Sequence, residues 1–306
     1  MALNTIDAWV PELWAAMTLS HLRSNMGFSR MLYRNYESQL ASYGETVNIP
    51  LPPTLAAKTK LRGQATVADD VEATTIPVSL NKHPYVKFEF DDVDLLKSKT
   101  DAMAVYSESA AIALKEHIEG ELLAEYVNAS KSLGADDANI GLGTLNRAQV
   151  ILTKNKAPMQ NRVAFISPDA WGVLSDSLTQ TQITPVSGDQ SALRTGSIGQ
   201  IKGFDIYQSQ LVNTTELPAE AGFVSHGIAM HREAVTLVSR PLRAPEAGTG
   251  AVGVVVQDPD IGMSFRVMMA FDSDKHVYKV TYDAIYGVKT LRPEFMLEIK
   301  QPVIED

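Results

Sequence analysis

The stretch TDAMAVYSESAAIALKEHIEGELLAEYVNASKSLG, residues 100–134, contains no proline and consists mostly of good helix formers. Its apolar residues recur at steps of three or four, the spacing of one helix face: Met103, Tyr106, Ala110, Leu114, Ile118, Leu122 and Tyr126. Gly134 stands where a C-terminal cap is expected. The pattern predicts one helix about 50 Å long, and so a structural spine rather than a connection between two strands.

Acidic residues are concentrated around this helix. Residues 89–137 carry a net charge of −8 in a chain whose total is −9, whereas residues 1–62 carry +2. Such asymmetry can steer one segment of a subunit toward another segment of its neighbour, although two solvated surfaces would give the same pattern. The acidic balance disfavours sequence-specific DNA binding, which needs clustered Lys and Arg.

Two runs of alternating apolar and polar residues precede the helix. Val47 and Ile49 belong to the first run, and residues 76–80 and 86–90 form the second. The residues between the runs, about 56–75, include few large apolar groups. Two strands joined by some twenty weakly hydrophobic residues predict a long protruding loop, which is normally functional or mobile.

The first part of the chain shows little sign of a core of its own. Residues 11–22 predict a short amphipathic helix behind Pro11, and the next 25 residues show no sustained period. The start of the chain also lacks the basic head and apolar core of a secretory signal, so we expect a protein made and used inside a cell. We interpret this part of the chain as an extended arm that lies on another surface.

Helices are predicted at residues 142–156 and from Pro168 onward, with a strand at 162–167 between them. Beyond residue 213, strand follows strand with turn residues between. Because no regular alternation of strand and helix appears, the predicted class is α+β with mostly antiparallel strands. A length of 306 residues corresponds to about two domains.

Residues 195–212, TGSIGQIKGFDIYQSQLV, place glycines at Gly196, Gly199 and Gly203. A phosphate-binding loop needs Lys and Ser or Thr directly after its glycines and then a helix, but here Lys202 precedes Gly203 and a strand-like run follows. These glycines are therefore interpreted as turn positions that return apolar side chains into a sheet.

No catalytic or metal-binding constellation is predicted. Gly248, Gly250 and Gly253 match a dinucleotide-binding spacing but precede a strand instead of following one. The six histidines form no HExxH motif, there is no G-x-S-x-G motif, and the chain contains no cysteine. The paired acids Asp91 with Asp92 and 258 with 260 are typical of turns. No apolar run is long enough to span a bilayer.

Several segments together resemble the major capsid proteins of tailed bacteriophages. They are ALNTIDAWVPELWA, TVNIPLPP, PVSLNKHPYVKFEFDD, GSIGQIKGFDIYQS and YGVKTLRPEFMLEI, in this order along most of the chain. The resemblance implies the Hong Kong 97 phage capsid fold. It places an N-terminal arm at 1–44, an extended loop at 45–90, a peripheral domain at 91–140 with 255–306, and an axial domain at 141–254.

The resemblance further implies a structural protein without cofactor, metal or catalysis, which assembles into pentamers and hexamers of an icosahedral virion shell around double-stranded DNA. Scaffolding, portal and decoration proteins are the implied partners, the host cytoplasm is the implied place of assembly, and no membrane is involved. An encapsulin-type bacterial compartment that encloses a protein cargo is an alternative with the same fold. An α+β enzyme with an unrecognised site is a second alternative.

Under this interpretation, apolar arm residues contact neighbouring subunits: Trp9, Leu13, Trp14 and Met17. Loop cations Lys58, Lys60 and Arg62 are expected to meet an acidic neighbour, such as the helix at 101–133. Some members of the resembled family join a loop lysine to an asparagine in the C-terminal part of the peripheral domain. Because no asparagine follows Asn213, we expect a non-covalent shell.

Overall fold

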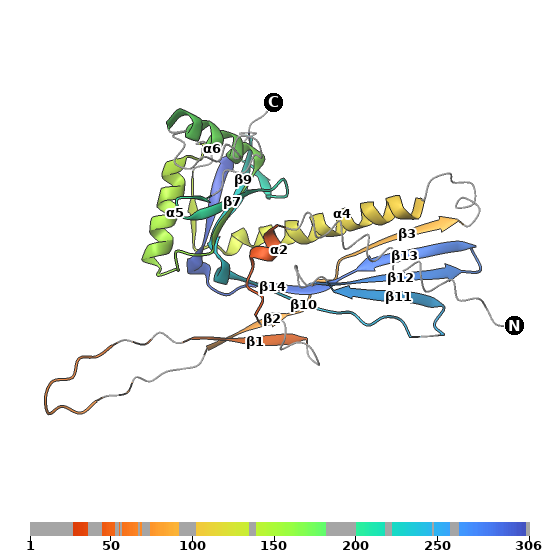
Figure 1. The fold of residues 1–306 in the computed structure, drawn as a ribbon, viewed down its shortest axis with the longest axis horizontal. Helices are drawn as coiled ribbons and strands as arrows, with labels where there is room; N and C mark the ends of the chain where they lie inside the picture. Colours follow the sequence, from red (N-terminus) through yellow and green to blue (C-terminus); the bar gives the residue numbers. More distant parts are fainter. Residues whose placement is uncertain are drawn as a thin grey trace, which may run out of the picture.

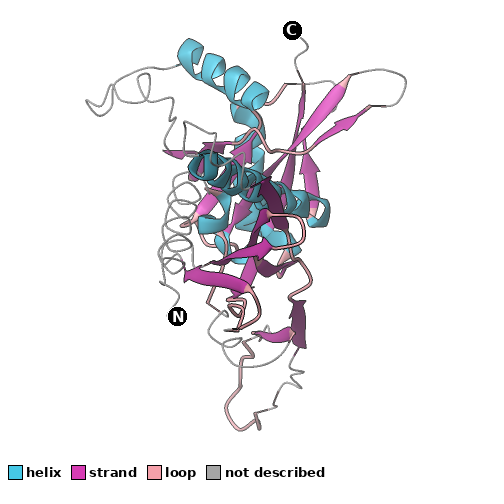
Figure 2. Ribbon diagram, turned by 90° about the vertical axis from the view of Figure 1, so that its right-hand side faces the viewer, coloured by secondary structure: helices cyan, strands magenta, loops and turns pink. Residues whose placement is uncertain are grey.

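The computed structural model describes residues 27–35, 45–52, 55, 57–66, 68, 74–91, 102–134, 139–181, 200–217, 222–246, 248–257 and 263–303. Figure 1 shows an elongated molecule with a block of helices around a sheet at upper left, a long helix above a second sheet toward the right, and a hairpin extending to the lower left. Turned by 90°, the described helices occupy the upper and middle parts of the molecule, and strands and loops occupy the lower part (Figure 2).

A seven-stranded sheet forms the upper block. Its order is β4 (Lys131–Leu133), β15 (Met296–Pro302), β9 (Phe223–His231), β5 (Arg162–Ile166), β7 (Phe204–Gln208) and β6 (Gln200–Ile201), with β8 (Thr214–Glu216) paired to β9. The β15–β4 and β5–β7 pairs are parallel, and the other pairs are antiparallel. Helices α5 (Leu142–Lys154) and α6 (Pro168–Thr181) lie beside this sheet (Figure 1). These elements confirm the strand and the two helices predicted between residues 142 and 181.

A buried arginine holds the loop that follows helix α5. Arg162 is 1% exposed, and its guanidinium donates to the carbonyl oxygens of Pro158 and Ala157 at 2.8 and 2.7 Å and to Oγ1 of Thr153 at 3.2 Å. Burial lowers the pKa of Arg162, but a guanidinium stays charged in proteins. Nη1 also donates to the carbonyl of Gln149, within α5, at 3.4 Å, so the arginine satisfies mainly the carbonyls of the loop that follows the helix.

The second sheet lies under the long helix. Its antiparallel order is β11 (Ala251–Gln257), β12 (Ser264–Asp272), β13 (Val277–Asp283) and β3 (Tyr85–Asp91), and the helix is α4 (Ala102–Leu123). Phe88 and Phe90 of β3 contact the ring of Tyr106 on α4, with centroids 5.7 and 4.8 Å apart. The hydroxyl of Tyr282 donates to Oγ of Ser107 at 2.8 Å. Aromatic packing therefore joins the sheet to the helix.

Helix α4 is shorter than the sequence pattern predicts. It ends at Leu123 and is followed by the 3₁₀ segment η2 (Ala124–Asn128) and then by β4, so the predicted helix is wrong beyond η2. The backbone N–H of Ser130 donates to the carbonyl of Met296 at 3.2 Å, and β4 pairs with β15. Sheet pairing thus supplies the backbone partners that further helix would have supplied. At 22 residues, α4 is about 33 Å long.

The protruding hairpin consists of β1 (Thr46–Leu51) and β2 (Thr74–Ser79), paired in antiparallel register. It packs on a second antiparallel pair, β10 (Val235–Arg240) and β14 (Ile285–Thr290). Residues 57–66 of the connecting segment lie far from both sheets (Figure 1). The two predicted strands and the protruding loop between them are therefore confirmed.

The segment 27–35 is not a free arm. Helix α2 (Phe28–Met31) places Phe28 in the main core, where its ring meets Phe165 edge-on at 4.6 Å, and Leu32 is fully buried. Tyr33 pairs in parallel with Thr236. The expectation that this stretch needs the surface of another molecule is wrong for 27–35, because isolated large apolar residues can enter a core without a sustained period.

The sheet to which each strand belongs indicates where the predicted domains begin and end. Strand β3 belongs to the four-stranded sheet, and β15 belongs to the seven-stranded sheet. The short segments η4 (Arg232–Ala234) and η5 (Pro293–Phe295) connect the sheets to the β10–β14 pair. We therefore propose that the extended loop ends before residue 85, and that 296–302 belong to the axial domain and not to the peripheral one.

Candidate assembly surfaces

The base of the hairpin is fixed to β14 by close backbone contact. A Cβ on Gly287 would lie 2.2 Å from the carbonyl oxygen of Ser79, closer than real Cβ atoms approach any atom. Tyr286, the preceding residue of β14, exchanges two backbone hydrogen bonds with Lys82, which follows β2, at 3.0 and 3.1 Å. Glycine is required at 287 because any side chain there would push the hairpin away.

The small core beneath the hairpin is separate from the main core. It buries six apolar side chains: Val47, Ile49, Val78, Leu80, Val238 and Leu291. The alternating burial along β1 shows that one face of this strand covers β10 and β14. The direction in which the loop protrudes is therefore set by a small cluster at its root.

A charged cluster holds the connection between β2 and β3 against α4. Lys82 Nζ lies 3.2 Å from Glu121 Oε1, and the hydroxyl of Tyr286 donates to the other oxygen of Glu121. Burial alone would raise the pKa of Glu121, but the hydrogen bonds from Tyr286 and Lys82 outweigh it and lower the pKa. Burial and the same carboxylate raise the pKa of Tyr286. Lys82 thus ties the hairpin to the spine helix.

A second ion pair reinforces this connection from the sheet side. Asp283 is 2% exposed and accepts from Nε of Arg266 at 3.0 Å, and His83 Nε2 lies 3.1 Å from its Oδ2. Removing one partner from such a buried group leaves an uncompensated charge, which is costly. The segment 81–84 is therefore anchored to α4 through Lys82 and to β13 through His83.

Carboxylates of α4 and η2 are largely engaged inside the subunit. Glu119 accepts from the backbone N–H of Gly27 at 2.8 Å, and burial raises the pKa of Glu119 despite this bond. Glu125 accepts from the hydroxyl of Thr290 at 2.6 Å. With Glu121 also paired, the spine is a weaker acceptor for a neighbour's cations than its sequence predicts, and Glu116 is the exposed acid on the described part of its surface.

The cations predicted as subunit contacts lie at the far end of the loop. Lys58, Lys60 and Arg62 are all exposed, and Leu61 between them is 64% exposed. The backbone N–H of Gln64 donates to the carbonyl of Leu61 at 3.1 Å, which forms a turn at this tip. The three cations and Leu61 are thus neighbours along one short exposed stretch of chain.

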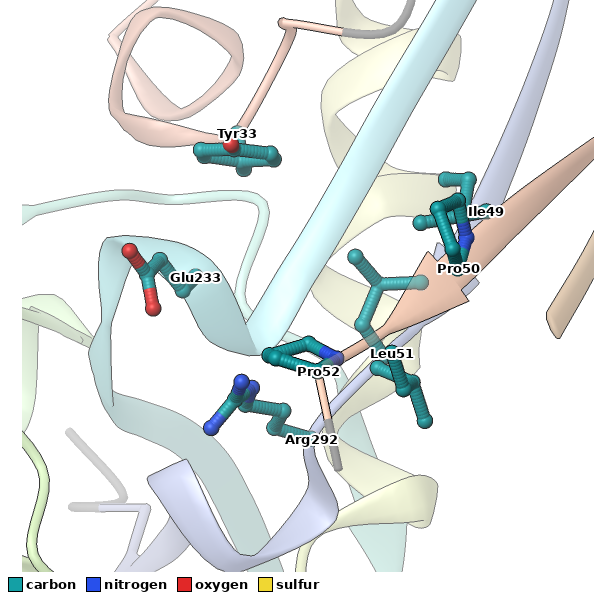
Figure 3. Close-up of a pocket in the computed structure, with 8 residues that line it drawn as sticks. Tyr33, Ile49, Pro50, Leu51, Pro52, Glu233 and Arg292 are labelled. Carbon is teal, nitrogen blue, oxygen red and sulfur yellow. The ribbon is translucent and has the colours of Figure 1, made fainter. Parts of the chain in front are cut away.

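A hollow of about 190 Å³ lies where β1 ends (Figure 3). Tyr33 and Glu233 border one side of it, and Pro52 lies beside Arg292 on the other. Tyr33 is held in place because its backbone carbonyl accepts from Thr236 Oγ1 at 2.8 Å and from the N–H of Leu237 at 3.2 Å. The hollow therefore has fixed walls at the root of the loop.

Gly203 is the one residue of the predicted turn glycines that the structure describes; Gly196 and Gly199 lie outside the described residues. Ile201 pairs with Phe204, and the two residues between them, Lys202 and Gly203, have φ of +50° and +79°. Two successive positive φ values are typical of a type I′ hairpin turn. The structure shows Gly203 as a turn position between β6 and β7.

The arm residues predicted as contacts, Trp9, Leu13, Trp14 and Met17, lie outside the described residues. Gly248 and Gly250 have positive φ and precede β11, which is not the setting of a dinucleotide-binding loop. Among the described residues, no group of three His, Asp or Glu side chains could hold a metal ion. No helix in that part of the chain is long and apolar enough to cross a membrane.

Sequence reasoning missed the residues that fix the loop. Gly287, Lys82 and Asp283 carry no local motif, because their partners are far away in sequence. The alternation of β14 indicates a strand at 285–290 but not that another strand crosses it. Only the three-dimensional pairing shows why a glycine and a lysine stand at these positions.

A subunit with a self-contained core and a long segment that protrudes without a core of its own is built to contact other molecules. Many solved structures share its fold, and three of them illustrate the likeness. One from Mycobacterium phage Che8 has a TM-score of 0.67 at 21% identity and covers 90% of this chain and 91% of that one. The capsid of cyanophage P-SCSP1u has a TM-score of 0.64 at 15% identity, and the match covers 90% of this chain and 87% of that one. The mature capsid of bacteriophage PhiM1 has a TM-score of 0.57 at 14% identity, and the match covers 85% of this chain and 83% of that one.

The fold is that of the subunits in these solved phage structures. The sequence model of the family described as phage capsid protein matches residues 73–299, from just before β2 to within β15. The chain belongs to the phage capsid protein family. No curated protein is significantly similar to it in sequence. The family match favours a phage capsid over the compartment alternative, and the fold is that of the Hong Kong 97 phage capsid.

Proposed function

We propose that this protein is the major subunit of the icosahedral shell of a tailed phage, and that it assembles as pentamers and hexamers around double-stranded DNA in the cytoplasm of the host. The observation that carries the proposal is the β1–β2 hairpin. Its base is fixed to β14 and α4, and the tip of its connecting loop lies far from the sheets of the same subunit. A segment that is directed so firmly away from its own core serves contacts between subunits.

The free energy of assembly comes from many small interfaces. Leu55 and Leu61 are 65% and 64% exposed on the loop, and burying such groups on a neighbour contributes about 25 cal/mol per Å² of apolar surface. The loop cations add electrostatic complementarity, which favours correct pairing and faster association. Weak contacts repeated many times allow misplaced subunits to leave before the shell closes.

The shell is non-covalent and performs no catalysis. The lack of an asparagine after Asn213 supports a non-covalent shell, and the family match supports a structural role. Scaffolding, portal and decoration proteins are further partners. In mature particles on a denaturing gel, this protein should run at about 33.4 kDa, and a ladder of bands at multiples of this mass would contradict the non-covalent shell.

Electron microscopy of the purified protein tests the proposal. We expect uniform hollow shells, and particles recovered from infected cells should contain nuclease-sensitive DNA once they are opened. Small discrete oligomers would refute the shell. Shells that contain an enzyme instead of DNA would show that the protein forms an encapsulin-type bacterial compartment.

The role of the loop is tested by the triple variant Lys58→Ala, Lys60→Ala and Arg62→Ala. It should fold normally but assemble less well, with the deficit largest at low salt, because screening weakens the contacts of the wild type at high salt. Lys87→Ala is the matched control, since this exposed lysine pairs with Glu89 in its own subunit at 2.6 Å. Equal assembly of the triple variant at all salt concentrations would exclude the role of these cations.

A further inference from the structure

An apolar groove of about 450 Å³ lies on the opposite end of the hairpin base from the hollow of Figure 3. Glu45 and Leu80 border it where the hairpin begins and ends, Ile285 where β14 begins, and residues 240–243 where β10 ends. Leu80, Leu242 and Ile285 give the groove an apolar floor. Arg240 and Arg243 outnumber Glu45 among its charges.

The wall formed by residues 241–246 is preformed although it has no regular secondary structure. The carbonyl of Arg243 accepts from Nη1 of Arg266 at 2.9 Å, and Arg266 is itself held by Asp283. A Cβ on Gly253 would lie 2.5 Å from Cδ of Pro245, so this glycine lets the segment lie directly on β11. A fixed wall binds a partner without a large cost of ordering.

We infer that this groove receives residues 6–14 of a second copy of the chain, IDAWVPELW. This inference rests on the proposed shell. The segment combines five large apolar residues with Asp7 and Glu12, and it contains no Lys or Arg. Its charge is opposite to that of the groove, and its apolar residues match the floor.

Charge also separates this segment from the other candidate within the chain. The loop tip carries Lys58, Lys60 and Arg62 around Leu61, and its positive charge is repelled by Arg240 and Arg243. The acidic end of the chain, residues 303–306, is a third candidate, and the cross-linking experiment below distinguishes it from residues 6–14.

The chain outside the described residues is long enough to reach a neighbour. Gly27 is held on α4 by Glu119, and 26 residues precede it. Fully extended, these residues span about 85 Å, more than the length of α4. The anchored position of Gly27 gives the segment a fixed origin from which to extend.

Disulfide trapping tests the inference directly, because the chain has no cysteine of its own. Shells of the double variant Trp9→Cys and Leu242→Cys are oxidised and run on a non-reducing gel. We expect most of the protein to move into bands of dimer size and above, and to return to one band on reduction. The single variants and the pair Lys60→Cys with Leu242→Cys are the controls and should stay monomeric.

Each other result of the trapping experiment overturns the inference. Shells without cross-links show that the segment binds elsewhere, and an intramolecular disulfide shows that the groove takes the chain's own arm. Cross-linking through Ile304→Cys instead of Trp9→Cys assigns the groove to the end of the chain. Absence of shells with the wild-type chain would instead refute the proposed function, so the two failures are distinguishable.

A charge swap gives an independent check. Arg243→Glu should reduce the yield of shells, and adding Glu12→Lys to it should restore the yield. Adding Lys58→Glu, the matched control on the loop, should restore nothing. A swap without rescue would exclude the ionic part of the contact.

Discussion

The two hydrophobic clusters of this subunit differ in size and in what they secure. The main cluster joins α4, α5, α6 and both large sheets, whereas the small one buries six side chains beneath the hairpin. The main cluster gives the subunit its stability, because stability grows with the apolar surface that is buried. The small cluster fixes the direction of a segment that its own subunit does not otherwise use. The stability of the subunit and the direction of its loop therefore depend on different residues.

The largest effect is expected in the main cluster. Leu114 on α4 is 1% exposed, so Leu114→Ala should lower the free energy of unfolding by about 2–5 kcal/mol through lost burial and the cavity left behind. Urea denaturation of the unassembled subunit measures this change. The control is Val127→Ala, which is 72% exposed and should change stability by less than about 0.5 kcal/mol. Equal midpoints for the two variants would contradict the role of the main cluster.

The second prediction separates the hairpin from β14. Gly287→Ala places a methyl group against the carbonyl of Ser79, and this overpacking should cost about 1–3 kcal/mol. Hydrogen exchange should quicken in β1 and β2, and shells should form poorly. Gly172→Ala in α6 meets no atom within 4 Å and should be neutral or stabilising. Unchanged exchange in β1 and β2 would show that the hairpin does not rest on Gly287.

The third prediction concerns the hairpin of β6 and β7. Gly203→Val in the two-residue turn between β6 and β7 should cost about 1–2 kcal/mol, because a β-branched residue strains at positive φ. No atom lies within 4 Å of the added Cβ, so the cost is conformational and not steric. Gly203→Asn should cost less, because asparagine tolerates this conformation. Thermal unfolding measures both variants, and a valine variant as stable as wild type would remove the need for glycine in this turn.

A smaller and more local effect is expected in the small cluster. Ile49 is 1% exposed, and Ile49→Val should cost about 0.5–1.5 kcal/mol. Hydrogen exchange should quicken in β1 and β2 and stay unchanged in β9 and β15, since the hairpin opens as a local unit. Equal acceleration in all four strands would show that the two clusters unfold together.

The smallest effect concerns the anchor of the segment 27–35. Burial raises the pKa of Glu119 above its ordinary 4.5, so the stability that this group contributes is present below pH 4.5 and is lost as the pH rises through the folded pKa. Glu119→Gln keeps an acceptor for the N–H of Gly27 but does not titrate. The stability of wild type relative to this variant should therefore fall as the pH rises above 4.5 and through the raised pKa of Glu119. Parallel urea midpoints across this range would contradict the raised pKa.

The sequence predicted those elements whose pattern is local. Helix α5, strands β1 and β9 and the turn at Gly203 all follow from periodicity or from turn chemistry. The predicted spine was too long, because residues 131–133 pair with β15, and no helix propensity reports a partner 166 positions away.

The contacts that hold the loop could not be predicted from the sequence. Lys82 meets Glu121 only because the chain between β2 and β3 passes the side of α4. The acidity of the spine was visible in the sequence, but its use within the subunit by Lys82, Gly27 and Thr290 was not. Such pairings depend on how elements cross, which charge patterns do not specify.

The position of β15 has a consequence for the timing of synthesis. This strand lies inside the seven-stranded sheet, between β4 and β9, although every other strand of the sheet precedes it in the chain. A nascent chain therefore exposes an unpaired edge of β9 until residues 296–302 leave the ribosome. Until translation completes the sheet, the open edge of β9 is a place where a strand of another copy, made on the same messenger RNA, can pair wrongly.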